Sequence, residues 1–319
     1  MPALACTLAA KPIGRKGQRM YQGDIIDPHH HLWDLSTGWY PWLTTERPKE
    51  MVFGDPEPLA RDYLPPDYRA DMAGVNPVKT VHIQGSGNRD DPVAETRWLE
   101  ALHKEYGMPN GIVASAPLDQ PGVDEVLAAQ CEHPLMRGIR SIVSWHSNPV
   151  FNFNERDDLM RDDVWRAGYA LLGKYSLSFD MMLFPSQLND ALDLARAYPN
   201  IQIILNHTGS PADRDEAGMA RWRDGMQALS AAPNVAVKIS DLCAYDHDWT
   251  VASFRPIILD TIEWFGVARC MFASDLPVVA LHGGAEKIYA AFKEIVAAFS
   301  EDEQRALFHD NAAKFYRLN

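Results

Sequence analysis

The sequence predicts a single-domain α/β protein built as a closed (β/α)8 barrel, the TIM-barrel architecture. The length of 319 residues is normal for such a barrel with insertions. Eight short apolar runs of strand length recur along the chain, and helix-like segments separate most of them. An open, doubly wound sheet is the alternative fold, but no G-x-G-x-x-G motif follows the first run to support it.

The apolar runs are the predicted strands. Several are unbroken, as expected for strands that are buried on both faces of a parallel sheet. They cover residues 24–31, 78–85, 111–118, 135–143, 177–183, 201–207, 235–240 and 269–275.

The intervening segments repeat apolar residues at spacings of three and four, which is typical of helices with one buried face. Clear examples are residues 92–107, 186–199, 215–233 and 283–299. Proline or glycine marks the ends of most of them. The gap at 32–77 is too long for one connection and is rich in Trp, Tyr and Pro, so we expect it to form a lid or a pocket wall.

Composition excludes several classes of function. The net charge of −13, from 43 acidic and 30 basic residues, argues against non-specific nucleic-acid binding, which needs a basic surface. No run approaches the roughly 18 apolar residues of a membrane span. The four cysteines form no C-x-x-C pair, which favours reduced thiols in a reducing compartment.

The N-terminal segment does not look like a secretory signal, because its short apolar stretch precedes the basic residues. We therefore expect a flexible leader over residues 1–20, a barrel domain over residues 21–319, and a cytoplasmic protein. The sequence allows a homo-oligomer but specifies no oligomeric state.

The C-terminal ends of the strands line the active site in barrels of this kind. Polar side chains are found at or near several of the predicted ends. They are His29 and His31, Gln84, Arg140 and Trp145, His207, Lys238 and Asp275.

His29 and His31 are two residues apart on the first predicted strand, so their imidazoles share one side and His30 points to the other. Such a pair can form half of a metal site or two hydrogen-bond donors. A single histidine here would more often be structural. With His207 and Asp275 at other strand ends, the set favours a functional site.

Asp275 ends an apolar run, where a carboxylate is poorly solvated unless it has a partner. It suits a general base that takes a proton from water and returns it to a leaving oxygen. The structural alternative is an N-cap for the next turn.

Arg140 lies on a predicted strand and is costly to bury alone. Its partner is either an anionic or polyhydroxylated ligand or an internal carboxylate such as Asp180. Lys238 presents the same choice between a neighbouring acid and the pocket.

Three more residues are candidate substrate contacts. Gln84 orients the substrate or caps its loop. Trp39 belongs to an aromatic stripe that stacks on a substrate ring or packs the long connection. Trp145 follows the fourth run.

These strand ends, taken in order, resemble the amidohydrolase superfamily, and specifically the amidohydrolase-2 branch that contains sugar lactonases and 2-pyrone-4,6-dicarboxylate lactonases. The resemblance implies a hydrolase that opens a sugar lactone or a dicarboxylate lactone. It places the family's histidine pair at His29 and His31, its later histidine at His207 and its aspartate at Asp275. The matching segments are IIDPHHHLWD, VHIQG, MRGIRSIVSW, ILNHTGSP, VKIS, MFASDLPV and HDNAAKFYRL, which run from about residue 24 to 319.

Two departures from the superfamily bear on metal content. Two-metal members use a carboxylated Lys on strand 4 and a His on strand 5, whereas this chain has Arg137 and Arg140 and then Asp180. A two-metal site is therefore not expected. One zinc ion held by some of His29, His31, His207 and Asp275 is one alternative, and a metal-free site, which this branch includes, is the other.

The resulting hypothesis is that Asp275 activates water to open a small-molecule lactone, while the three histidines or a metal stabilise the oxyanion. A zinc-dependent, non-oxidative decarboxylase of an aromatic or related acid is the alternative enzyme. A barrel that only binds a ligand is the alternative outside catalysis, and the full set of polar strand ends argues against it.

Overall fold

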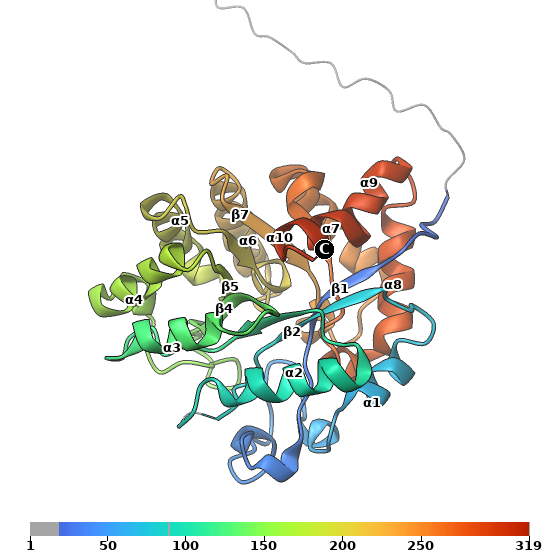
Figure 1. The fold of residues 1–319 in the computed structure, drawn as a ribbon. Helices are drawn as coiled ribbons and strands as arrows, with labels where there is room; N and C mark the ends of the chain where they lie inside the picture. The colour runs from blue at the N-terminus through green and yellow to red at the C-terminus, as the bar shows by residue number, and fades with distance from the viewer. Residues whose placement is uncertain (1–18, 89, 319) are drawn as a thin grey trace, which may run out of the picture.

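The computed structural model describes residues 19–88 and 90–318, so the leader predicted for residues 1–20 lies almost entirely outside the described residues. Eight parallel strands form one sheet in chain order, and helices surround it (Figure 1). The predicted (β/α)8 barrel is therefore confirmed.

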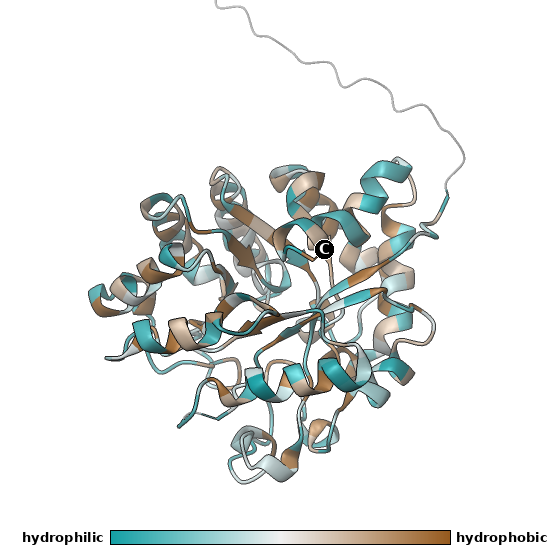
Figure 2. Ribbon diagram, in the orientation of Figure 1, coloured by the Kyte–Doolittle hydropathy of each residue, from teal (hydrophilic) through white to brown (hydrophobic). Residues whose placement is uncertain are grey.

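Each predicted run contains one strand. The strands are β1 (Ile26–His30), β2 (Lys79–Ile83), β3 (Gly111–Ala114), β4 (Met136–Ile142), β5 (Ser178–Met182), β6 (Ile203–Leu205), β7 (Val235–Ile239) and β8 (Cys270–Phe272). Nearly all of their residues are buried, because helices cover the outer face and side chains fill the interior. Figure 2 shows apolar residues concentrated on the strands and polar ones on the outer helix surfaces.

Helices form in the segments where apolar residues repeat at spacings of three and four. They are α1 (Pro65–Asp71), α2 (Ala94–Tyr106), α3 (Val123–Cys131), α4 (Asp163–Lys174), α5 (Leu188–Ala197), α6 (Glu216–Leu229), α7 (Val251–Phe265), α8 (Gly284–Ile295), α9 (Glu301–Arg305) and α10 (Asn311–Phe315). Among the described residues, none of them combines the length and apolar character that crossing a membrane requires.

The barrel closes where β1 meets the segment that follows β8. The Asp275 amide donates to the His29 carbonyl at 2.8 Å, and the His31 amide donates to the Leu276 carbonyl at 2.7 Å. These two bonds bring the ends of β1 and β8 together at the C-terminal face of the barrel.

A buried carboxylate reinforces this closure. Asp27 on β1 accepts hydrogen bonds from the amide and hydroxyl of Ser274, at 2.8 and 2.7 Å. The Tyr68 hydroxyl of α1 donates to the same carboxylate at 2.8 Å. Burial raises the pKa of Asp27. One fully buried group thus joins β1, α1 and the segment after β8.

The barrel interior holds a second buried charge. The Lys238 ammonium on β7 lies 2.5 Å from the Asp180 carboxylate on β5, and both side chains are fully buried. The Tyr316 hydroxyl and the Asn206 amide also donate to Asp180, at 2.7 and 3.1 Å. Burial lowers the pKa of Lys238 to about 8. Of the two alternatives for Lys238, its contacts favour the internal acid.

The long connection after β1 is anchored by a third buried acid. Glu95 on α2 accepts hydrogen bonds from the Tyr40 hydroxyl at 3.0 Å and the Gly85 amide at 3.1 Å. Burial raises the pKa of Glu95 to about 7. This carboxyl therefore links the connection over residues 32–77 to the loop that follows β2.

Replacing Ser274 with alanine should weaken the closure of the barrel. The change removes one donor to the Asp27 carboxylate and one acceptor of the Leu276 amide. We expect the free energy of unfolding to fall by about 1–3 kcal/mol, because buried groups are left unsatisfied. Urea denaturation measures it. Ser186→Ala at an exposed position is the control and should stay within about 0.5 kcal/mol of wild type. Equal stability of the two variants would contradict the closure role.

Glu95→Gln should change how stability depends on pH. The folded protein holds the Glu95 proton up to about pH 7, whereas the unfolded chain releases it near pH 4.5. Wild type therefore loses stability as pH rises from 4.5 to 7, by on the order of 3 kcal/mol through this group. The Gln variant lacks that loss. Denaturation at several pH values compares the slopes, with Glu132→Gln at an exposed site as the control. Parallel profiles for wild type and Glu95→Gln would sink this interpretation.

Candidate active site

A cavity of about 210 Å³ opens at the C-terminal ends of the strands. The connection over residues 32–77 supplies much of its wall, as the aromatic composition of that segment predicted. The polar lining residues include His31, Arg140, His207, Asp241, Tyr245 and Asp275, while the wall from the long connection contains Trp33, Pro41, Trp42, Met51, Val52 and Phe53.

His29 and His31 share one side of the first strand and its end, as their spacing predicted. Their Nε2 atoms lie 3.0 and 3.2 Å from Oδ1 of Asp275. The two rings meet edge to face, with centroids 5.2 Å apart. Asp275 is therefore held between two imidazoles.

His30 points away from this group, again as predicted. Its ring packs against Tyr68 and His82, with centroids 4.5 and 5.7 Å away. Burial lowers the pKa of His30 to about 3, so the ring is neutral at physiological pH. It supports the strand and does not line the cavity.

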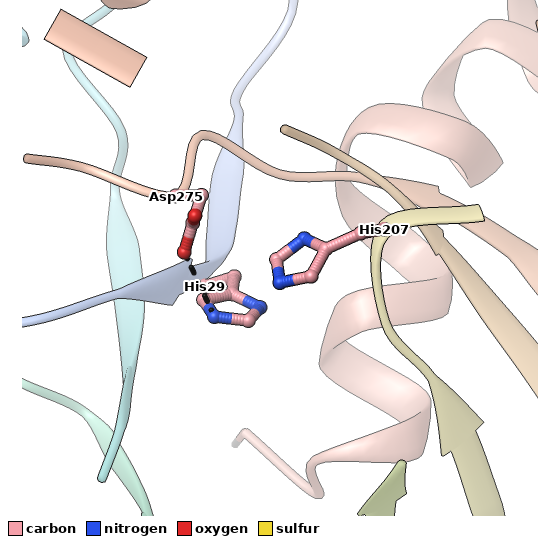
Figure 3. A group of neighbouring side chains, drawn as sticks. All are labelled: His29, His207 and Asp275. Carbon is pink, nitrogen blue, oxygen red and sulfur yellow. Dashed lines mark ion pairs between the residues drawn. The ribbon is translucent and has the colours of Figure 1, made fainter. Parts of the chain in front are cut away.

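His207 completes the group from the loop after β6 (Figure 3). Its ring centroid is 4.7 Å from that of His29, and its Nδ1 lies 3.0 Å from the Ser240 hydroxyl. His29, His207 and Asp275 come from three strand ends and converge in Figure 3, where the dashed line joins His29 to Asp275.

Three lining residues adopt left-handed backbone conformations, which side chains other than glycine rarely do. The φ angles are 52° at His207, 49° at Asp241 and 69° at Asp275. Strained backbone of this kind costs about 1–3 kcal/mol per residue and clusters at functional sites. Each of these residues lies two or three positions after the end of a strand, where the left-handed backbone turns its side chain into the cavity.

The two aspartates that line the cavity, Asp275 and Asp241, have pKa values shifted in opposite directions. Burial alone would raise the pKa of Asp275, but interactions with the His29, His207 and His31 imidazoles outweigh burial and hold that pKa well below its usual range. Burial and the negative charge of Asp275 raise the pKa of Asp241 well above its usual range. Burial also lowers the pKa of His207 to about 4. The two shifts thus favour the ionised form of Asp275 and the protonated form of Asp241.

The sequence interpretation missed Asp241. It directly follows Ser240, where the predicted strand 7 run ended, so a search one residue further along that strand end would have found it. Tyr245, Ser86 and Glu46 also line the cavity without having been predicted.

Of the predicted substrate contacts, Arg140 lines the cavity, whereas Gln84, Lys238, Trp39 and Trp145 do not. The roles of these four residues as substrate contacts stay predictions. Gln84 caps its own loop by accepting from the Ser86 amide at 2.5 Å. Trp39 packs against Trp98, and the Trp145 amide donates to Gln187. The position of a residue at a strand end does not reveal whether its side chain points into the cavity or bonds to its own loop.

The donor set fits a divalent metal ion. One ligand atom from each of His29, His207 and Asp275 lies within 4.8 Å of the others. The Nε2 atom of His29 is buried and lies 3.0 Å from the Asp275 carboxylate, without the geometry of a hydrogen bond. Nδ1 of His31 lies 2.7 Å from the Ile83 carbonyl, to which it can only donate, so the Nε2 of a neutral ring turns a lone pair toward Asp275. Facing lone pairs favour a positive charge between them, either a proton or a metal.

Known proteins resemble this chain over most of its length. The chain is 41% identical to the uncharacterized protein y4mH of Sinorhizobium fredii over 92% of this chain and 98% of the relative. It is 27% identical to the L-fucono-1,5-lactonase of Burkholderia ambifaria over 92% of this chain and 96% of the relative. A crystal structure of an amidohydrolase from Burkholderia multivorans with bound zinc matches at a TM-score of 0.78 and 25% identity, over 93% of this chain and 100% of that chain.

The family model for amidohydrolases matches residues 26–318, which is nearly the whole described barrel. The resemblance inferred from the ordered strand ends is therefore confirmed. The chain belongs to the amidohydrolase family.

Proposed function

We propose that this amidohydrolase opens lactone rings with Asp275 as the general base. The observation that carries the proposal is the Asp275 carboxylate, which lines the cavity and lies 3.0 and 3.2 Å from the Nε2 atoms of His29 and His31. The L-fucono-1,5-lactonase relatives, at 27% and 28% identity over 92% of the chain, support the same reaction class.

The proposed reaction begins with a water molecule beside Asp275. The carboxylate takes one proton as the water oxygen adds to the lactone carbonyl. The ring C–O bond then breaks, and the same proton passes from Asp275 to the leaving alkoxide. The product is the open hydroxy acid, so one water is consumed for each ring opened.

The negative oxygen of the tetrahedral intermediate needs donors at the cavity floor. His207 is suited to this role because Ser240 holds its Nδ1 and its Nε2 has no hydrogen-bond partner among the described residues. His31 is fixed by the Ile83 carbonyl and positions Asp275. The apolar wall from the long connection keeps bulk water from the reacting carbonyl.

We further propose that His29, His207 and Asp275 hold one zinc ion, in which case Nε2 of His207 would be a ligand and the ion would replace it as the partner of the negative oxygen. A divalent ion bound there would polarise the substrate carbonyl as a Lewis acid.

Asp275→Asn should lower kcat for lactone hydrolysis by about 10²–10⁴, because the amide cannot accept the proton of the attacking water. A pH-indicator assay of lactone opening measures the rate, and near-ultraviolet circular dichroism verifies the fold. Asp302→Asn, at an exposed site on α9, makes the same chemical change away from the cavity and should keep wild-type turnover. Full turnover by a folded Asp275→Asn enzyme would rule out Asp275 as the base.

Zinc binding should depend on His207. After incubation with zinc and dialysis, wild type should retain about one zinc ion per chain, and His207→Gln should retain far less. Elemental analysis measures the content independently of activity. His309→Gln, at a histidine outside the cavity lining, is the control and should match wild type. A wild-type protein that retains no zinc would contradict the proposed ligand set.

A further inference from the structure

The lining of the cavity points to one class of lactone. We infer that the substrate combines an apolar or aromatic body with a single carboxylate, and that Arg140 binds this carboxylate. The inference rests on the proposed lactone hydrolysis. It departs from both substrate classes that the sequence predicted, because a sugar lactone is a neutral polyol and a dicarboxylate lactone carries two charges.

The walls of the cavity are largely apolar. Trp33 and Trp42 meet edge to face, with ring centroids 5.7 Å apart, and both line the cavity. Phe53, Phe153 and Met182 extend this surface from separate parts of the chain. Such a surface gains free energy by covering rings and alkyl groups and offers nothing to a hydroxyl.

The two tryptophans also keep their polar atoms away from the ligand. The indole nitrogen of Trp33 donates to the Arg61 carbonyl at 2.8 Å. That of Trp42 donates to the Gly85 carbonyl at 3.0 Å. Both rings are therefore fixed in place by the backbone and present only carbon surfaces to the cavity.

Several polar groups of the floor are occupied by one another. His31 is held between Ile83 and Asp275. The Asp241 carboxyl lies against Asp275 and accepts from the Cys243 thiol at 3.7 Å. A sugar ring would have to bury several hydroxyls against this lining, and a buried hydroxyl without a partner is costly.

Arg140 is the one Lys or Arg side chain of the described lining, and it has binding capacity to spare. Its side chain is only 6% exposed, one terminal nitrogen donates to the Gln84 carbonyl, and Nε is buried without a partner. Within residues 19–88 and 90–318, no carboxylate oxygen lies within the 4.0 Å ion-pair distance of its guanidinium. Asp180, the internal candidate, is bound to Lys238 instead. A buried guanidinium without an acid is a site for a carboxylate ligand.

The remaining charges limit the ligand to one carboxylate. Among the described lining residues, Arg140 is the one Lys or Arg side chain, while Glu46, Asp241 and Asp275 are acids. A second carboxylate would face these acids or the apolar wall. The volume of about 210 Å³ also sets the size, because a cavity of about 150 Å³ holds benzene. The space is therefore larger than one benzene ring and fits a small lactone that carries one ring substituent and one carboxylate.

The test compares matched lactones in a pH-indicator assay. The probe is 5-oxo-2-phenyloxolane-3-carboxylate, in which water adds to the ring carbonyl and the ring C–O bond breaks to give a hydroxy diacid. We expect its kcat/KM to exceed those of its methyl ester, of a hexono-1,5-lactone and of 2-pyrone-4,6-dicarboxylate by about 100-fold. A higher kcat/KM for the sugar lactone or for the dicarboxylate would overturn the substrate inference and leave lactone hydrolysis standing.

The role of Arg140 is tested by Arg140→Met. This variant should lose most of the preference for the carboxylate over its methyl ester, mainly through a higher KM. Arg137→Met is the control, because Arg137 also lies on β4 but donates to the Pro134 and Met136 carbonyls outside the cavity. It should keep the wild-type preference. A preference that survives in Arg140→Met would contradict the assignment.

A binding measurement separates failure of this inference from failure of the proposed function. The ketone 4-oxo-2-phenylcyclopentane-1-carboxylate has the same shape but no ester bond to break. Calorimetry should detect its binding to wild type and at least about tenfold weaker binding to Arg140→Met. Such binding without hydrolysis of any lactone would reject the lactonase proposal and retain the ligand class. Equal affinity of the two proteins, or no binding, would reject the ligand class.

Discussion

Asp27 lies where β1 meets the segment after β8, and its buried carboxylate accepts both hydrogen bonds that Ser274 donates to it. The site depends on this closure, because His31 and Asp275 are separated by 244 residues in the chain. The neighbouring backbone bonds from His31 to Leu276 and from Asp275 to His29 set the register of the two ends. The Asp275 carboxylate and two imidazoles therefore meet because the barrel closes. Their arrangement depends on the contacts between β1 and the segment after β8.

The charged groups of the barrel divide between its interior and the cavity. The Lys238–Asp180 pair lies in the interior with no place in the cavity lining, so each of these charges is neutralised within the protein. Asp275, Asp241, His31 and His207 line the cavity, and the pKa values of the two carboxyl groups are shifted in opposite directions. The walls are largely apolar. This arrangement leaves Arg140 as the cation that a ligand can neutralise, which is why the lining favours an anionic, largely apolar molecule.

Much of the barrel could be predicted from the sequence, because hydrophobic periodicity is a local property and each strand or helix carries its own signal. All eight runs contain strands, and the opposite directions of His30 and of the His29 and His31 pair follow from the alternation of side chains along a strand. The placements of Gln84, Lys238, Trp39 and Trp145 could not be predicted in this way. The side chains of the first three are used by a loop, an internal acid and a helix residue, and the backbone amide of Trp145 donates to Gln187. Such partners are set by packing.

The sequence by itself determined the succession of strands and helices, the amidohydrolase resemblance and the polar residues at the strand ends. Only the tertiary structure decided which of those residues face one cavity, that Asp241 lies against Asp275, and that Asp180 pairs with Lys238 and not with Arg140. The physical reason is that pattern and propensity act over a few neighbouring residues. Burial, ion pairing and the pKa of a carboxyl depend on groups that closure of the barrel brings together from distant parts of the chain.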